Sequence, residues 1–400
     1  EPQDHPNDFQ YPGGPPVPPY DAAGWTLAYQ RGVQFDRVME GFDGPFESNP
    51  RGALIALSSS VASSATGYLL DARANQSFKA VNILLNNGVE VYRISGNTDN
   101  TLGSFYIPSG SRSKSVIDKI ARENSVHFSA VSKKPSSLIK IKKARIALWD
   151  TYGGSMPSGW VRWMMEQFNY SFDVIYPKGI DSGNLRSGYD VIIFVGGAIP
   201  GTGSRGFAMG GRGTADSMIP PQFRAMTGRI TVERSIPQLK SFMEQGGSVI
   251  TIGSSTQLAY HLKLPVTDAM VEVENGAERS LTREKYFTPG SILKVTTDNQ
   301  QMTAAGMAKE TDVYFDNSPV FRLNPDAVSS GTIRPLAWFT ADKPLRSGWA
   351  WGQAYLKNGI VAFEANIGKG KLYAFGPEIT FRAQSYGTFK FLFNQLYNYQ

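Results

Sequence analysis

Short apolar runs alternate with helical patterns through residues 144–400. Turn residues or amphipathic stretches separate the runs, which is the pattern of strands that alternate with helices. Strand–helix–strand order requires right-handed crossovers and a parallel sheet. We therefore predict an α/β domain of the flavodoxin-like, doubly wound class. Its expected strands are 145–150, 172–177, 189–198, 248–253, 359–366 and 371–376, and its expected helices are 159–168, 236–247, 255–262 and 388–399.

Residues 265–345 interrupt this rhythm. Short β-type pieces at 271–275, 292–297, 311–316 and 319–324 are separated by turn residues and have no helices between them. Strands joined by short turns pair antiparallel. We therefore expect an inserted β-rich layer within the larger domain.

A smaller α/β domain is expected over residues 35–143. Its expected strands are 53–57, 67–70, 89–94, 104–108 and 126–131, and its expected helices are 77–88 and 114–124. The following segment, LIKIKK, alternates isoleucine with lysine. This alternation indicates the solvated side of an edge strand rather than a patch for nucleic acid.

Residues 1–34 contain a proline-rich tract that we interpret as a connector. Proline lacks a backbone N–H, so this tract lies extended and builds no core of its own. It nevertheless carries Phe9, Tyr11, Tyr20 and Trp25. We expect these rings to lie along the folded body of this chain, or to face a domain outside it, rather than to project into water.

Composition narrows the possible chemistry. Of the 400 residues, 41% are hydrophobic and 18% are charged, which is typical of a globular chain. There is no cysteine, which excludes disulfides, thiolate nucleophiles and cysteine-held metals. The three histidines, His5, His127 and His261, lie in no H-x-x-E or H-E-x-x-H pattern. We expect neither a cofactor nor a metal in this chain.

The charge balance and the hydropathy indicate few special partners. A net charge of +6 is mild for this length, and no basic helix or aromatic stacking platform stands out, so no nucleic-acid partner is expected. No run of about eighteen apolar residues occurs, so no transmembrane segment is expected. The chain begins at Glu1 rather than Met, which suggests processing or cutting and a segment upstream.

A glycine-rich stretch matches a nucleotide-binding pattern by its letters alone. GTGSRG at 201–206 fits G-x-G-x-x-G, but the residues after it stay glycine-rich instead of opening a helix. We therefore interpret it as a mobile surface loop, and the role of the Gly/Arg-rich region 199–234 stays open.

GSST at 253–256 is the most specific candidate for a catalytic motif in the sequence. It follows an expected central strand and opens a helix, as a nucleophile elbow does, which makes Ser254 and Ser255 candidate catalytic residues. His261 follows seven residues after Ser254 on the same helix, where it points along the helix rather than back at the elbow. The favoured interpretation is that Ser254 and Ser255 cap the helix.

Three segments carry a family resemblance. DHPNDFQYPGGPPVPPYDAAGWTLAYQRGV, RIALWDTYGGSMPSGWVRWMMEQF and GKGKLYAFGPEITFRAQSYGTFKFLFNQL resemble the C-terminal half of large secreted bacterial carboxypeptidases of the M14 zinc metallopeptidase family. The resemblance implies a peptidase domain N-terminal to Glu1, which would hold the zinc. It also implies an accessory, non-catalytic role for this chain, which would pack on the peptidase domain and position peptide substrate. The implied location is secreted, periplasmic or at the cell surface.

Residues 144–400 are also similar to class I glutamine amidotransferase-like domains. Alignment of TIGSSTQL with that family's elbow puts Gly253 at the position of the nucleophilic cysteine. AFGPE puts Gly376 where the histidine belongs, so only Pro377 and Glu378 remain of that motif. The resemblance thus implies an inactive relative, a pseudoenzyme domain.

Two alternatives stay open. In the first, a shift of one residue in this alignment makes Ser254 the nucleophile of an amide or ester hydrolase, with Glu378 as a further candidate. In the second, the chain binds a glycan or a polypeptide through exposed aromatic residues. The candidate rings are Trp338, Trp349, Trp351 and Tyr355, for which burial in the core is the favoured interpretation.

Overall fold

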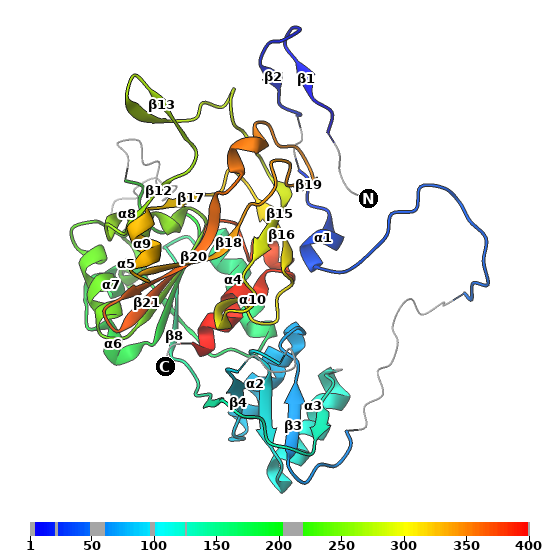
Figure 1. Cartoon of the computed structure of the whole chain (residues 1–400). Helices are drawn as coiled ribbons and strands as arrows, with labels where there is room; N and C mark the ends of the chain where they lie inside the picture. The colour runs from blue at the N-terminus through cyan, green and yellow to red at the C-terminus, as the bar shows by residue number, and fades with distance from the viewer. Residues whose placement is uncertain are drawn as a thin grey trace. The chain divides into compact units, whose positions relative to one another are not determined.

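The computed structural model describes residues 5–20, 23–48, 61–96, 101–124, 126–202 and 219–398 (Figure 1). The chain divides into two units. The smaller unit covers residues 33–142, and the larger unit combines residues 2–32 with residues 143–400.

The smaller unit is a five-stranded antiparallel sheet with two helices. Its elements are β3 (Gly67–Leu70), α2 (Asn75–Asn86), β4 (Tyr92–Ile94), β5 (Phe105–Pro108), α3 (Ser111–Asn124), β6 (Ser129–Val131) and β7 (Leu138–Lys140). The strand order β6-β3-β5-β4-β7 gives its first four strands the ferredoxin-like βαββαβ arrangement. Phe78 of α2 packs edge-on against Phe105, which fastens this helix to the sheet. β7 is an edge strand, as its alternating lysines predict, and the expected strand 53–57 lies outside the described residues.

Five parallel strands form one half of the sheet of the larger unit. They are β8 (Ile146–Trp149), β9 (Asp173–Ile175), β10 (Val191–Phe194), β11 (Ser248–Ile252) and β21 (Gly370–Phe375). Their spatial order, β9-β8-β10-β11-β21, is the 2-1-3-4-5 order of flavodoxin-like folds, as predicted. All residues of β8, β10 and β11 are buried, because helices cover both faces of a parallel sheet.

The covering helices lie on the two faces of this sheet (Figure 1). Two of them, α4 (Met156–Gln167) and α10 (Phe389–Phe393), lie on one face. The other face carries α5 (Pro177–Asp181), α6 (Leu185–Gly188) and α7 (Ser235–Glu244). Phe168, at the end of α4, packs against Phe393 of α10 with ring centroids 4.7 Å apart, so aromatic contacts close the core on the first face.

The inserted region is β-rich and antiparallel, as expected, and its strands extend this sheet. β20 (Ile360–Ile367) pairs antiparallel with β21, and its far edge then receives antiparallel strands. These are β18 (Ile333–Trp338), β15 (Ser291–Thr297) and β16 (Glu310–Phe315), while β17 (Phe321–Leu323) pairs with both β20 and β12 (Val266–Asp268). The expected strand 359–366 corresponds to β20 and, contrary to the prediction, is not parallel to the others, so its edge accepts antiparallel strands. β13 (Val271–Glu274) and β14 (Ala277–Ser280) form a separate hairpin.

Residues 23–32, which we call the strap, lie on the larger unit. Within the strap, α1 (Leu27–Arg31) brings Tyr29 against a buried cluster of Ile292, Tyr314 and Phe381. The Trp25 ring packs edge-on against Phe381, with centroids 5.3 Å apart. The sequence predicted this docking for Trp25.

The residues before the strap dock less completely. β1 (Asp8–Phe9) and β2 (Pro16–Val17) form a short hairpin, from which the Phe9 ring contacts Trp351. Tyr11 and Tyr20 are 61% and 109% exposed on this chain. Of the four rings considered above, Phe9 and Trp25 therefore lie on the body of the chain, whereas Tyr11 and Tyr20 do not.

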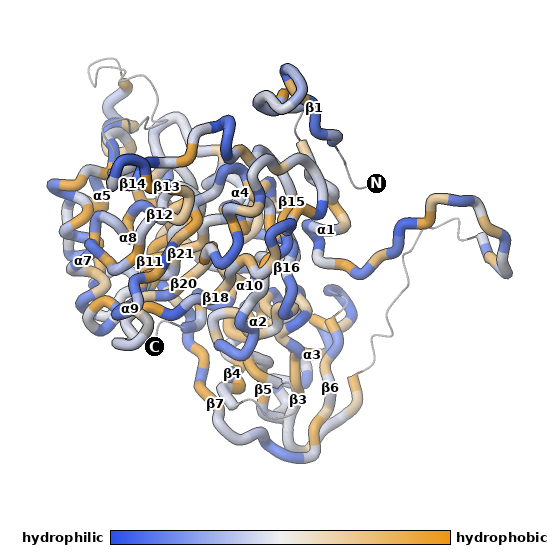
Figure 2. The backbone as a smooth tube through the Cα atoms, turned by 45° about the horizontal axis from the view of Figure 1, so that its top comes forward, coloured by the Kyte–Doolittle hydropathy of each residue, from blue (hydrophilic) through white to orange (hydrophobic). Residues whose placement is uncertain are grey.

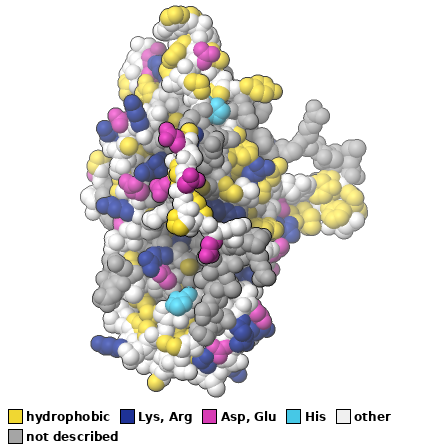
Figure 3. All heavy atoms as spheres, turned by 90° about the vertical axis from the view of Figure 1, so that its right-hand side faces the viewer, with side chains coloured by type: hydrophobic (Ala, Val, Ile, Leu, Met, Phe, Trp, Pro, Cys, Tyr) yellow, Lys and Arg dark blue, Asp and Glu magenta, His cyan; other side chains and the backbone are white. Residues whose placement is uncertain are grey.

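The hydropathy of the backbone follows this architecture. In Figure 2, apolar segments run along the strands of the larger sheet. Within the described ranges, no helix has both the length and the apolar character needed to cross a membrane. Figure 3 shows Lys and Arg interspersed with Asp and Glu on the face in view, so the net positive charge is not gathered there.

Candidate functional site

The loops that follow β10, β11 and β21 meet at one edge of the parallel sheet. These three strands are neighbours, so their carboxyl ends lie side by side. In open α/β sheets ligands bind outside the carboxyl ends of the strands. This edge places Gly196 and Gly197 after β10, Ser254 after β11 and Glu378 after β21, and we therefore treat it as the candidate site.

Gly253 forms the turn between β11 and the 3-10 helix η3 (Gly253–Gln257). Its φ of +60° lies in the left-handed region, which suits an elbow and favours glycine. A Cβ built on Gly253 would lie 2.1 Å from Glu378 Oε1. The Glu378 carboxyl group therefore fills the space that the side chain of a nucleophile at this position would need.

Ser254 is exposed beside this carboxyl group. Its Oγ accepts a hydrogen bond of 2.8 Å from the Gly197 N–H. A Cβ built on Gly196 would lie 2.8 Å from Glu378 Oε1 and 4.0 Å from Ser254 Oγ. The structure thus brings two of the three candidate residues, Ser254 and Glu378, to the same small space over Gly196.

Ser255 has a structural role. Its buried Oγ accepts hydrogen bonds of 3.2 Å from the N–H groups of Ala198 and Ile199, and it donates to the Val195 carbonyl. This hydroxyl holds the loop after β10 in place. The interpretation of Ser254 and Ser255 as helix caps is wrong, because η3 starts at the end of the strand without a side-chain cap and both hydroxyls reach across to the neighbouring loop.

The histidine of this region also bonds elsewhere. His261, in α8 (Leu258–His261), places its Nε2 2.7 Å from the Pro200 carbonyl oxygen. It thereby anchors the same loop and is not bonded to Ser254. At Gly376, where the amidotransferase-like alignment expects a histidine, a Cβ would lie 2.1 Å from the Pro319 carbonyl oxygen. The backbone packing leaves no room for an imidazole at that position.

The environment of Glu378 is unfavourable to its charge. Its Oε2 is buried and has no hydrogen-bond partner among the described residues. Burial, with a smaller contribution from the charge of Asp316, raises the pKa of Glu378 to about 7. The backbone that follows is strained, because Arg382 and Ala383 have φ of 50° and 53°. A carboxyl group that titrates near neutral pH is typical of functional sites.

This carboxyl group gives a pH-dependent prediction for stability. The folded chain keeps a proton on Glu378 that the unfolded chain releases, so stability should fall as pH rises from the ordinary value of 4.5 to about 7. The Glu378→Gln variant cannot ionise and should show a smaller fall and a higher melting temperature than wild type at pH 8. Circular dichroism melts from pH 4 to pH 8 measure this effect.

The control for this prediction is Glu166→Gln, which changes an exposed glutamate of α4. It should leave the pH profile of the wild type unchanged. Parallel profiles for wild type and Glu378→Gln would contradict the assigned titration.

The expected glycine-rich loop lies mostly outside the described residues. The described residues include Gly201 and Thr202 of GTGSRG, but 203–218 lie outside them.

Of the four aromatic candidates for glycan binding, Trp349 is buried and its Nε1 donates to Asn7 Oδ1 at 3.0 Å. Trp338 and Trp351 are half-buried, and only Tyr355 is exposed. The four rings therefore do not form one exposed stacking surface.

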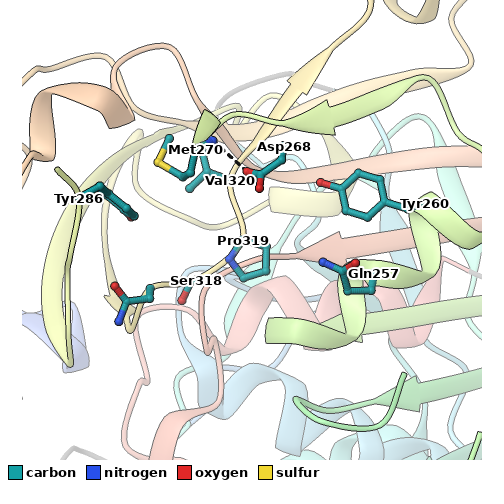
Figure 4. Close-up of a pocket in the computed structure, with 9 residues that line it drawn as sticks. Gln257, Tyr260, Asp268, Met270, Tyr286, Ser318, Pro319 and Val320 are labelled. Carbon is teal, nitrogen blue, oxygen red and sulfur yellow. Dashed lines mark hydrogen bonds between the residues drawn. The ribbon is translucent and has the colours of Figure 1, made fainter. Parts of the chain in front are cut away.

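A separate cavity of about 210 Å³ lies between the parallel core and the inserted region (Figure 4). It is lined by Gln257, Tyr260, Asp268, Met270, Tyr286, Asn317, Ser318, Pro319 and Val320. Sequence reasoning missed this cavity because its residues come from several separate segments and form no motif. Both Gln257 and Ser254 belong to η3, so the cavity and the candidate site share an element.

No family model and no curated protein matches the sequence. Among solved structures, a protein from Thermoplasma acidophilum described as a putative GMP synthase component is similar at 9% identity over 64% of this chain and 97% of its own, with a TM-score of 0.35. A putative ThuA-like protein from Bacteroides uniformis is similar at 9% identity over 64% of this chain and 94% of its own, with a TM-score of 0.33.

A β-galactosidase from Bacillus circulans sp. alkalophilus is similar at 14% identity over 62% of this chain, with a TM-score of 0.34. The matched region spans 31% of that enzyme's length.

Proposed function

We propose that this chain is the accessory, non-catalytic part of a secreted M14-type zinc metallocarboxypeptidase. It would pack on the peptidase domain and position peptide substrate for it. The support is the resemblance of its proline-rich start, its β8–α4 segment and its C-terminal segment to that family. In this proposal the zinc belongs to the peptidase domain, and the location is secreted, periplasmic or at the cell surface.

The geometry at Gly253 carries the non-catalytic part of this proposal. We infer an amidotransferase-like domain in which a glycine stands at the nucleophile position and Glu378 Oε1 fills the adjoining space. Nucleophilic catalysis needs an activated side chain at such an elbow. At this elbow the space of such a side chain is instead filled by the Glu378 carboxyl group.

The direct test uses the full coding sequence. We expect a zinc peptidase domain upstream of Glu1 and, when that domain and this chain are purified separately, a 1:1 complex in size-exclusion chromatography. Addition of this chain should lower the KM of the peptidase for long peptides and leave its KM for dipeptide substrates unchanged. A coding sequence without such a domain, or two proteins that neither associate nor affect each other, would refute the proposal.

A serine hydrolase is the second candidate, and one observation favours it. The exposed Ser254 hydroxyl and the Glu378 carboxyl group border the same space, and a carboxylate with a pKa near 7 can serve as a general base. The accessory proposal predicts no difference between wild type and Ser254→Ala in two assays. These assays measure the release of p-nitrophenol from p-nitrophenyl acetate and of ammonia from glutamine.

The Ser254→Ala variant should also melt at the wild-type temperature, because Ser254 is exposed. A loss of activity of about tenfold or more with an unchanged melting curve would instead establish the hydrolase.

A further inference from the structure

The cavity beside η3 is not used by the candidate chemistry described above. Gln257 and Tyr260 line it from the parallel core, and Asp268, Met270 and Tyr286 line it from the inserted region. Its volume of about 210 Å³ is below the roughly 300–1,000 Å³ of sites for drug-sized ligands. The cavity therefore fits a ligand about as large as one amino-acid side chain.

The lining of the cavity carries negative charge but no positive charge. Asp268 is an acidic lining residue, and no lining residue is Lys, Arg or His. Asp268 Oδ1 accepts a 2.8 Å hydrogen bond from the Met270 N–H, drawn as the dashed line in Figure 4. Within the described part of the chain, no basic group lies within 4.0 Å of this carboxylate; the nearby Arg322 pairs at 3.8 Å with Glu278 instead. Such a lining disfavours an anion.

Asp268 is exposed at the edge of the cavity, so a cation can reach its carboxylate from solvent. Partial desolvation by the surrounding groups raises the pKa of Asp268, since the hydrogen bond from Met270 and the charge of Arg322 do not fully compensate for it. A cation bound at the carboxylate would supply the missing compensation.

The neighbouring groups add neutral oxygen acceptors. The hydroxyl of Tyr260 points toward Asp268 in Figure 4. Burial, and to a smaller extent the charge of Asp268, raises the pKa of both Tyr260 and Tyr286, so both phenols stay neutral at physiological pH. An ammonium group has three N–H donors and a guanidinium group has five, and phenol and carboxylate oxygens accept from both.

We propose that this cavity binds an organic cation, namely a primary ammonium or guanidinium group on a short aliphatic chain. The charged end would meet Asp268 and the hydroxyl of Tyr260. The aliphatic stem would lie along Met270, Pro319 and Val320, as the stems of lysine and arginine do on apolar surfaces. The inference goes beyond the accessory role, because it requires neither a peptidase domain nor catalysis.

The first test uses isothermal titration calorimetry to measure the binding of butylamine and of butylguanidine to the purified chain at pH 7.5. Butan-1-ol has the same stem without the charge and should bind at least about tenfold more weakly. Galactose tests the alternative of a neutral sugar. Equal or stronger binding of butan-1-ol or galactose, or no binding of either cation, would overturn the proposal.

The second test uses Asp268→Asn, which keeps an oxygen that can accept from the Met270 N–H and removes the charge. Binding of butylamine should weaken at least about tenfold in Asp268→Asn, and should be unchanged in the control Asp342→Asn, which alters an exposed acid outside the cavity. Equal affinity of wild type and Asp268→Asn would overturn the proposal.

The source of the cation is distinguished by the capped tripeptide Gly-Lys-Gly. Binding of this peptide as tightly as butylamine would identify the ligand as a basic side chain of a polypeptide. Binding of butylamine alone would identify it as a small free amine. Either result supports the cation site, which fails only on the outcomes given above.

Discussion

Deletion of residues 1–32 is expected to lower the melting temperature of the larger unit by roughly 10 °C and to expose apolar surface. The deletion removes Trp25 and Tyr29 from the cluster around Tyr314 and Phe381. It also removes two backbone hydrogen bonds, from the Gly24 N–H to the Gly290 carbonyl and from the Gly387 N–H to the Gln30 carbonyl. The buried hydroxyl of Ser347 loses its partner Thr26, 2.6 Å away.

Differential scanning calorimetry and binding of a dye for apolar surfaces measure this effect. The matched control deletes residues 1–20 and leaves the strap in place. It should shift the melting temperature less, because Tyr11 and Tyr20 are exposed. If removal of residues 1–32 leaves the melting curve as it was, the strap is a plain linker.

Introduction of a nucleophile at the elbow, as Gly253→Cys, is expected to destabilise the larger unit without creating an enzyme. The new Cβ would meet Glu378 Oε1 at 2.1 Å, and the φ of +60° is unfavourable for any residue with a Cβ. Together these effects should cost on the order of 3 kcal/mol in the free energy of unfolding.

The clash with Glu378 and the backbone strain of the positive φ can be separated with the smaller substitution Gly253→Ala and its controls. Urea denaturation measures the stability of each variant. Gly197 has a φ of +84° but nothing within 4 Å of a built Cβ, so Gly197→Ala reports backbone strain alone and should cost less. Addition of Glu378→Ala to Gly253→Ala should recover stability by removing the clash. A Gly253→Ala variant as stable as wild type would show that Glu378 does not exclude a side chain at position 253.

The sequence predicts the parallel half of the sheet well and the rest less well. β8, β10 and β11 are continuous apolar runs, because both of their faces are covered, and such runs stand out in a sequence. The inserted strands were recognised as β-type pieces, but not as a continuation of the same sheet. Their partners depend on the direction of β20, which no local pattern encodes.

At the candidate site, too, local sequence patterns do not predict the contacts between distant segments. Ser254, Ser255 and Glu378 could be named from their motifs, yet their roles differ because of contacts across the fold. Ser255 is engaged by a loop 57 residues away in sequence. The position of Glu378 depends on the loop that continues to the left-handed Arg382 and Ala383. Local propensity does not predict such conformations, because tertiary contacts impose them.

The attachment of the strap has a consequence for synthesis on the ribosome. The side chain of Gln30 is bonded to Ser385, which lies 355 residues later in the chain. At about 5–20 residues per second, the strap would wait roughly 20–70 seconds for its docking surface to be translated. During that interval Trp25 and Tyr29 have no partner from the C-terminal segment, whereas the smaller unit already has all of its strands. A nascent chain should therefore bind a chaperone through the strap until the last helix emerges.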